Sequence, residues 1–188
     1  MIQLHATKKL FQQLPLAADG TLPSTPRSQW LFDQPPLESN PLSGWHGNLI
    51  TLQRRKCILL VHDQTRFPVF LPALKKAGVA ELNDRFVDGF MNTLLKCGAD
   101  DAQMESAQRR LRPLRVDTSC DRSVQGTSNW MRQYLEHAVM AEGINLAETL
   151  GYGLGAVLAD IPYSVRGRKG YIYPDKEMLA LLAALDAG

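Results

Sequence analysis

The segment 48–71 constrains the fold most, because it alternates three short apolar runs with two polar turns. The apolar runs are residues 48–52, 57–62 and 67–71. Runs of this length joined by short polar turns predict an antiparallel meander of three strands. Pro68 lies in the third run and has no backbone N–H, so we expect that strand to lie at an edge of the sheet or to begin there.

Helical periodicity follows the meander. In the segment 82–95, apolar residues recur at the spacing of one helix face. Further helices are predicted at 8–14, 100–111, 123–140 and 175–185, with short strands at 2–5 and 114–117 and a hairpin within 163–173. The sequence therefore predicts an α+β fold in which a small antiparallel meander packs against several helices.

Length and composition favour one domain over residues 1–188. The chain has 188 residues, of which 45% are hydrophobic, and this suffices for a core without metal or disulfides. A proline-rich loop at about 15–44 contains six prolines, and we interpret it as a surface excursion anchored by Trp30, Leu31 and Phe32. No run of about 18 apolar residues occurs, so we expect no membrane span.

The three cysteines argue against a disulfide framework or a zinc site. Cys57, Cys97 and Cys120 are odd in number, far apart and outside any CxxC pattern. We expect each to be a small buried apolar residue in a reducing compartment. The first residues lack the segments of a signal peptide, which predicts a cytoplasmic protein. Neither a metal site nor a cofactor is expected.

Common catalytic motifs are missing from the sequence. Neither GxSxG nor HExxH occurs, and the glycines of 151–155 lack the spacing of a phosphate-binding loop. His62 and Asp63 are adjacent, but neighbouring strand residues point to opposite faces, so they are not expected to form a dyad.

Basic residues cluster at the meander turns. Arg54, Arg55 and Lys56 lie in the first turn and Arg66 in the second. Arginine suits bidentate contacts with phosphate or carboxylate groups. Two interpretations remain open: a solvated surface balanced by acidic residues elsewhere, or a surface that binds an acidic partner. The net charge of +2 does not decide between them.

Two further features have both a structural and a functional interpretation. The segment 121–129 is dense in short polar residues where a helix begins, which predicts either an N-cap network or an anion-binding helix start flanked by Arg122. His46 precedes the first meander strand and is either a structural histidine or a general acid–base.

Topology predicts which of these residues share a site. Consecutive turns of a meander lie at opposite ends of it, so only one of the two turns can lie beside the residues that enter the first strand. This is the second turn, 63–66, which we expect beside residues 46–48. The expected site combines the strand entry and the second turn with the helix 123–140. Its candidate binding residues are His46, Asn48, Asp63, Arg66, Arg122, Ser123 and Asn129. Arg54, Arg55 and Lys56 are expected about 15–20 Å away, as an extended basic surface.

One core is expected behind this site. We expect its nine members to be buried together: Trp45, Leu49, Leu59, Val61, Phe86, Phe90, Leu94, Met131 and Leu135.

Four segments in order along the chain resemble a known family. They are MIQLHATKKL at 1–10, WHGNLITLQRRK at 45–56, VHDQTR at 61–66 and DRSVQGTSN at 121–129. They are similar to a bacterial domain-of-unknown-function family, number 6933, some members of which are fused to plasmid-type domains. The resemblance implies no reaction, substrate or cofactor. Relatives with Tyr-Ala in place of His46-Gly47 argue against an obligatory catalytic role for His46.

Three functions follow from these features. The first is an interaction module that binds an acidic or phosphate-bearing partner, either nucleic acid or an acidic protein. The second is a metal-independent enzyme or mobile-element toxin acting on a nucleotide or RNA, with His46 as the acid–base. The third is a protein-binding partner in a toxin–antitoxin or defence system.

Overall fold

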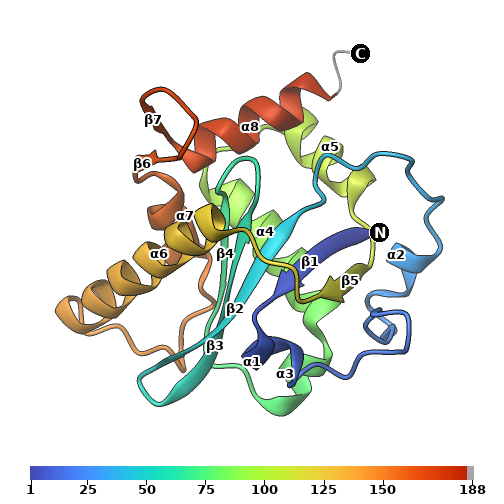
Figure 1. Cartoon of the computed structure of the whole chain (residues 1–188), viewed down its shortest axis with the longest axis horizontal. Helices are drawn as coiled ribbons and strands as arrows, with labels where there is room; N and C mark the ends of the chain where they lie inside the picture. The colour runs from blue at the N-terminus through green and yellow to red at the C-terminus, as the bar shows by residue number, and fades with distance from the viewer. Residues whose placement is uncertain (186–188) are drawn as a thin grey trace.

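A five-stranded mixed sheet forms the centre of the protein, with helices on both faces (Figure 1). This computed structural model describes residues 1–185. The strands of the main sheet, in the spatial order β4-β3-β2-β1-β5, are β4 (Pro68–Leu71), β3 (Arg55–His62), β2 (Trp45–Leu52), β1 (Ile2–Ala6) and β5 (Leu114–Asp117). A second, two-stranded sheet pairs β6 (Tyr163–Ser164) with β7 (Tyr171–Ile172).

The predicted meander is confirmed as β2, β3 and β4, with Pro68 opening the edge strand. The first turn is tighter than expected. Only Gln53 and Arg54 lie between the strands, both with positive φ (48° and 58°), as a two-residue hairpin turn requires. Arg55 and Lys56, predicted in the turn, belong to β3 instead.

The sheet extends beyond the meander, and the purely antiparallel expectation is corrected there. β1 lies between β2 and β5 and pairs parallel with both, so the α+β class holds but the sheet is mixed. In this register His5 lies beside His46 on one side and beside Asp117 on the other. Parallel pairing joins segments far apart in the chain, and the local pattern of short strands does not reveal it.

The five predicted helices are confirmed, with some changes at their ends, and three short helices at 29–32, 76–80 and 152–159 were not predicted. The helices are α1 (Lys8–Phe11), α2 (Gln29–Phe32), α3 (Lys76–Ala80), α4 (Leu82–Lys96), α5 (Asp101–Arg110), α6 (Arg122–Ala141), α7 (Tyr152–Ala159) and α8 (Pro174–Ala184). The first helix is only one turn long, and the glycine-rich segment begins α7. Within residues 1–185 no helix is long and apolar enough to cross a bilayer.

The loop between α1 and β2 is held to the body of the protein. Leu22, Leu31 and Leu42 are buried in the same core as β1 and α4. The short helix α2 supplies Leu31, as the apolar anchor in this loop predicted.

Two cores replace the one that was expected. Trp45, Leu49, Phe86, Phe90 and Leu94 are buried on the α4 face of the sheet. The other four members of the predicted set, Leu59, Val61, Met131 and Leu135, are buried on the α6 face. The set is therefore buried but not together. β3 is covered on both faces, so successive residues enter opposite cores.

His62 ends β3 in the core on the α4 face. Its side chain is fully buried, Nδ1 contacts the Thr65 hydroxyl at 2.9 Å, and the ring packs against Trp45 at 5.0 Å between centroids. Burial lowers the pKa of His62 from 6.5 to about 4, although Asp63 acts in the opposite direction. His62 is therefore neutral in the folded protein at neutral pH.

Acidification from pH 7 to pH 5 is expected to lower the unfolding free energy by about 2 kcal/mol through His62 alone. Between its folded pKa of about 4 and its unfolded 6.5, the unfolded chain binds a proton that the folded protein does not. This stability is complete above pH 6.5 and declines as the pH falls toward 4. Urea unfolding of wild type and His62→Asn at both pH values measures it. Identical pH dependence of the two proteins would contradict it.

Candidate functional site

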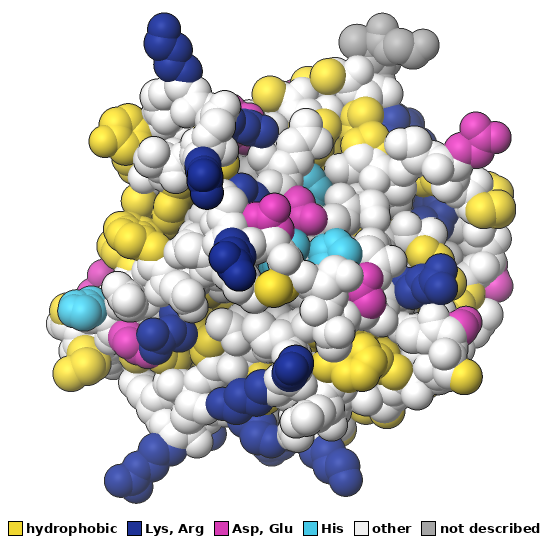
Figure 2. Space-filling model, viewed as in Figure 1, with side chains coloured by type: hydrophobic (Ala, Val, Ile, Leu, Met, Phe, Trp, Pro, Cys, Tyr) yellow, Lys and Arg dark blue, Asp and Glu magenta, His cyan; other side chains and the backbone are white. Residues whose placement is uncertain are grey.

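A row of polar side chains crosses three neighbouring strands on the α6 face. His46 in β2, His5 in β1 and Asp117 in β5 are cross-strand neighbours. Their chain neighbours Leu4, Trp45 and Val116 point into the core on the α4 face, so alternation turns the polar residues toward α6. Histidine and acidic side chains gather near the middle of this face in Figure 2.

His46 is held at both ring nitrogens. Its Nε2 accepts a hydrogen bond from the Asp121 backbone N–H at 2.7 Å, and its Nδ1 lies 2.5 Å from the Asp63 carboxylate. A nitrogen that accepts carries no proton, so Nδ1 carries it and donates to Asp63. His46 therefore fastens the start of α6 to β2 and to the turn after β3. With no ring nitrogen free, this geometry favours its structural role.

Arg66 reinforces the same junction. Its guanidinium donates to the Asp63 carbonyl and to the Ser123 hydroxyl, the latter at 3.1 Å. The residue is only 5% exposed and has a positive φ of 61°. Burial lowers its pKa, while Asp121 and Asp63 oppose the shift. Both terminal nitrogens of Arg66 are bonded within the protein and its Nε is buried without a partner in the described part of the chain, so Arg66 is not exposed to bind an anion from solvent.

Asp121 confirms the N-cap interpretation of the segment 121–129. Its carboxylate accepts from the backbone N–H groups of Ser123 and Val124, at 2.7 and 3.1 Å. These bonds, first that from Val124, lower the pKa of Asp121. Two of the helix's free N–H groups are thereby satisfied from within the chain.

His5 differs from His46, because only one of its ring nitrogens is bound. Nδ1 lies 2.7 Å from the Asp117 carboxylate, while Nε2 has only Asp63 within ion-pair range, at 4.0 Å. The His5 side chain is 20% exposed. An imidazole whose Nδ1–H is held by a carboxylate presents an open Nε2, which is the arrangement that general-base histidines use.

Asp117 is itself firmly positioned. Besides His5, its carboxylate accepts from Gln3 Nε2 at 3.0 Å and from the Ser119 backbone N–H at 2.9 Å. Partial burial alone would raise the pKa of Asp117, but the bonds from His5 and Ser119 outweigh it and lower the pKa. Asp117 is therefore an ionised acceptor that orients the imidazole.

His5 lines a small pocket, named here the His5 pocket, of about 200 Å³. Its lining comes from β1, β2 and α6 and the segments beside them, and consists of His5, Thr7, His46, Gly47, Asn48, Cys120, Gln125, Ser128 and Asn129. No lysine or arginine is among these residues. The interior is thus neutral and rich in amide and hydroxyl groups.

Ser128 gives the pocket an unused polar group. The residue is 4% exposed, and its hydroxyl oxygen is buried without a hydrogen-bond partner among the described residues. Leaving a buried hydroxyl unpaired costs about 1–3 kcal/mol.

Cys120 corrects the expectation that every cysteine is buried. Cys57 is buried and Cys97 half-buried, but Cys120 is exposed and lines the His5 pocket. It lies in the irregular segment between β5 and α6, where no strand or helix places it in a core.

Cys120 is expected to be the one cysteine that iodoacetamide alkylates rapidly in the folded protein. Burial raises the pKa of Cys97 to about 12 and also raises that of Cys57, so both are protonated at pH 8. Mass spectrometry of briefly treated protein should show one adduct, absent from Cys120→Ser. Two or more adducts at equal rates would contradict the burial of the other thiols.

The candidate residues divide between two environments. His46, Asp63, Arg66 and Ser123 form the bonded junction, and Asn48 and Asn129 line the pocket beside it. Arg122 is exposed at the first position of α6. Arg54, Arg55 and Lys56 lie at the opposite end of β2 and β3.

The sequence interpretation missed His5, Asp117, Cys120, Gln125 and Ser128. One signal was present: β1 and β5 alternate apolar and polar residues, as in Ile2-Gln3-Leu4-His5. That alternation marks a polar face on each strand. It does not show that the two strands are parallel neighbours.

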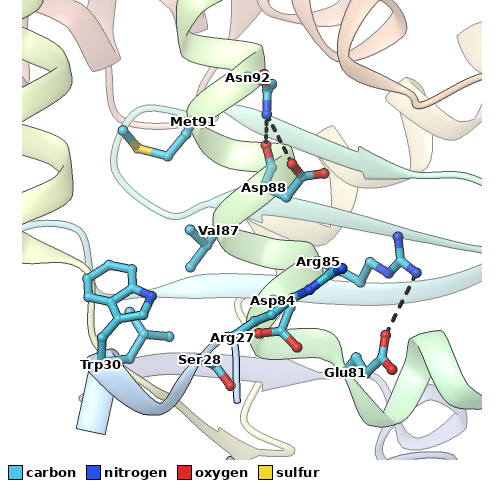
Figure 3. Close-up of a pocket in the computed structure, with 11 residues that line it drawn as sticks. Arg27, Ser28, Trp30, Glu81, Asp84, Arg85, Val87, Asp88, Met91 and Asn92 are labelled. Atoms are coloured by element: carbon cyan, nitrogen blue, oxygen red, sulfur yellow. Dashed lines mark hydrogen bonds and ion pairs between the residues drawn. The ribbon is translucent and has the colours of Figure 1, made fainter. Parts of the chain in front are cut away.

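A larger hollow of about 410 Å³ lies between α2 and α4 (Figure 3). Its charged groups are largely paired with neighbours. Arg85 faces Glu81 at 3.8 Å, and Asp84 accepts from the Thr25 hydroxyl at 2.8 Å. Because it offers no open acid–base group comparable to His5, the smaller pocket is the better candidate site.

Metal ligands do not converge in the part of the chain that the structure describes. No group of three His, Cys, Asp or Glu side chains there is arranged to hold a metal ion. His5, His46, Asp63 and Asp117 instead form hydrogen-bonded pairs.

Comparison with known proteins gives a family. Neither a curated protein nor a solved structure matches the chain significantly. A family model described as a domain of unknown function, DUF6933, matches residues 3–177 and so covers every residue of the His5 pocket. On this match, the chain belongs to the DUF6933 family.

Proposed function

We propose that this protein is an enzyme in which His5, oriented by Asp117, transfers a proton at a polar substrate bound in the His5 pocket. The observation that carries the proposal is the state of the two ring nitrogens. Nδ1 is bound to Asp117 at 2.7 Å, Nε2 has no hydrogen bond among the described residues, and His5 lines a cavity. Positioned acid–base groups of this kind contribute about 10²–10⁴-fold to rates.

The proton transfer follows from the hydrogen bonds. The lone pair on Nε2 accepts a proton from a substrate hydroxyl or a bound water, and the ring becomes an imidazolium. Asp117 stabilises that cation through the Nδ1–H bond, and Asp63, 4.0 Å from Nε2, adds a second negative charge. The deprotonated oxygen bonds to the substrate atom that carries the leaving group, and Nε2 returns the proton to that leaving group as its bond breaks.

The lining supports a nucleotide or RNA as the substrate class to test first. Asn48, Gln125 and Asn129 each offer an amide with paired donors and an acceptor, the groups that read the edge of a base. The volume of about 200 Å³ is below the roughly 300–1,000 Å³ of drug-sized ligand sites, so the pocket suits one base or sugar. The three unpaired cysteines accord with action in the cytoplasm.

The test is a substrate panel with a matched variant. Wild type and His5→Gln are incubated with nucleoside mono-, di- and triphosphates, 2′,3′-cyclic nucleotides and a mixed-sequence RNA, and products are identified by mass spectrometry. At least one substrate should be converted by wild type and about 100-fold more slowly by His5→Gln. Equal rates would contradict the role of His5. Failure of the whole panel would contradict the substrate class.

A further inference from the structure

Seven exposed cationic side chains gather at the end of the molecule that holds the tip of the β2–β3 hairpin. They come from α1, the β2–β3 hairpin and the start of α3, and are named here the basic end: Lys8, Lys9, Arg54, Arg55, Lys56, Lys75 and Lys76. Figure 1 shows the hairpin tip, α1 and α3 at the same lower end, and Figure 2 shows lysine and arginine side chains along that edge.

Direct contacts join the three segments. Lys56 Nζ donates to Gln13 Oε1 at 2.8 Å, which places the end of α1 against β3. The Leu74 backbone N–H donates to the Lys56 carbonyl at 2.7 Å, which places Lys75 next to the hairpin. The arginine-bearing turn is a rigid two-residue hairpin rather than a long loop.

The charge of the basic end is not neutralised locally. No Asp or Glu occurs in residues 7–18, 48–62 or 67–80. Within residues 1–185 none of the seven cations forms an ion pair. The loop that Gln53 contacts through Ile144 carries Glu142 and Glu148, and neither is paired with Arg54 or Arg55.

The charge is therefore separated along the molecule. Seven of the 21 Lys and Arg residues lie at the basic end, so the other 14 are outnumbered by the 19 acidic residues, which all lie outside those segments. A net charge of only +2 conceals this asymmetry. Clustered uncompensated cations create a positive potential that attracts polyanions.

We propose that the basic end binds the phosphodiester backbone of a nucleic acid. The absence of exposed apolar surface favours this partner. None of the exposed large hydrophobic side chains belongs to the three segments. A protein partner would require an apolar centre in the interface, and a membrane would require apolar side chains that insert into it. Phosphate backbones, in contrast, are bound by charge alone. The segments carry no exposed aromatic residue for base stacking either, so contacts to the backbone dominate.

This inference does not depend on the enzyme proposal. The hairpin residues Arg54 and Arg55, which the test changes, are separated from His46 by most of β2, about 20 Å at roughly 3.3 Å per residue. Substitutions at one site leave the other site's residues in place, so each proposal can fail alone.

Binding is tested by fluorescence anisotropy with labelled duplex DNA, duplex RNA and single-stranded RNA, titrated at about 50–300 mM KCl. The proteins are wild type, Arg54→Gln/Arg55→Gln, and the control Lys96→Gln/Arg109→Gln, which removes the same charge from α4 and α5. Circular dichroism verifies that all three are folded. Phosphatidylcholine–phosphatidylserine vesicles serve as a competing polyanionic surface.

Wild type should bind at least one nucleic acid, with affinity that falls steeply as salt rises. The Arg54/Arg55 variant should bind at least about tenfold more weakly at 100 mM salt, with a log–log salt slope shallower by about 2, because each phosphate contact contributes about 0.9. The control should stay within about twofold of wild type. No binding at 50 mM salt, equal weakening in the control, or tighter binding to vesicles than to every nucleic acid would overturn the proposal.

Discussion

Gly151→Ala is expected to destabilise the protein by about 3 kcal/mol or more. A Cβ at this position would lie 2.4 Å from the Phe70 carbonyl oxygen and 2.6 Å from Pro72 Cδ. The Phe70 contact is with the backbone of β4, which cannot move away as a side-chain tip could. The φ of +87° adds the strain that an L-residue has in the left-handed region. Urea unfolding at pH 7 measures the loss.

Gly98→Ala is the matched control for this substitution. Gly98 has nearly the same φ, +83°, but no atom lies within 4 Å of its added Cβ. Gly98→Ala should lower the unfolding free energy only by the conformational strain, about 1–2 kcal/mol. The difference between the two variants isolates the close approach of α7 to β4. Equal losses would mean that α7 does not pack against Phe70 as described.

Asp117→Asn is expected to lower turnover of the substrate found with wild type by about 10²–10⁴-fold. A neutral asparagine has no negative charge with which to stabilise the imidazolium that forms on His5 when Nε2 accepts the proton. Substrate contacts in the pocket are untouched, so kcat should fall while KM stays within a few-fold. Steady-state kinetics across pH measure the change. A fall confined to KM would contradict an orienting role.

Asp121→Asn is the control for the charge itself. It removes one carboxylate from the same region, and asparagine caps a helix as well as aspartate does. Asp121 has no contact with His5 among the described residues, so turnover should change by less than about threefold. A loss as large as that of Asp117→Asn would show that the general electrostatic field matters, and not the Asp117–His5 bond.

Local pattern was sufficient for most of the elements. Apolar runs and two polar turns predicted β2, β3 and β4, and the spacing of Phe86, Phe90 and Leu94 predicted α4. Asp100 caps the start of α5, and the Gln103 side chain reinforces this cap. These signals succeed because turn geometry, capping and helix periodicity act between residues a few positions apart.

The junction of the site was accessible to topological reasoning. The rule that consecutive meander turns lie at opposite ends placed His46 near Asp63 and Arg66, and the structure brings these residues together at hydrogen-bonding distance. The same rule separated them from Arg54. It could not show that both ring nitrogens of His46 are bonded within the protein, because that depends on which groups α6 brings to the junction.

The sequence by itself determined the strands, five of the helices, the α+β class and the family, since each rests on short-range pattern or on ordered segments of the chain. Tertiary structure alone decided that β1 lies between β2 and β5, that two cores replace one, and that three basic segments meet at one end. His5 and Asp117 are 112 residues apart and yet bonded. Parallel pairing is a contact between distant segments whose own residues are compatible with several neighbours, so only the packed sheet specifies which partner each strand takes.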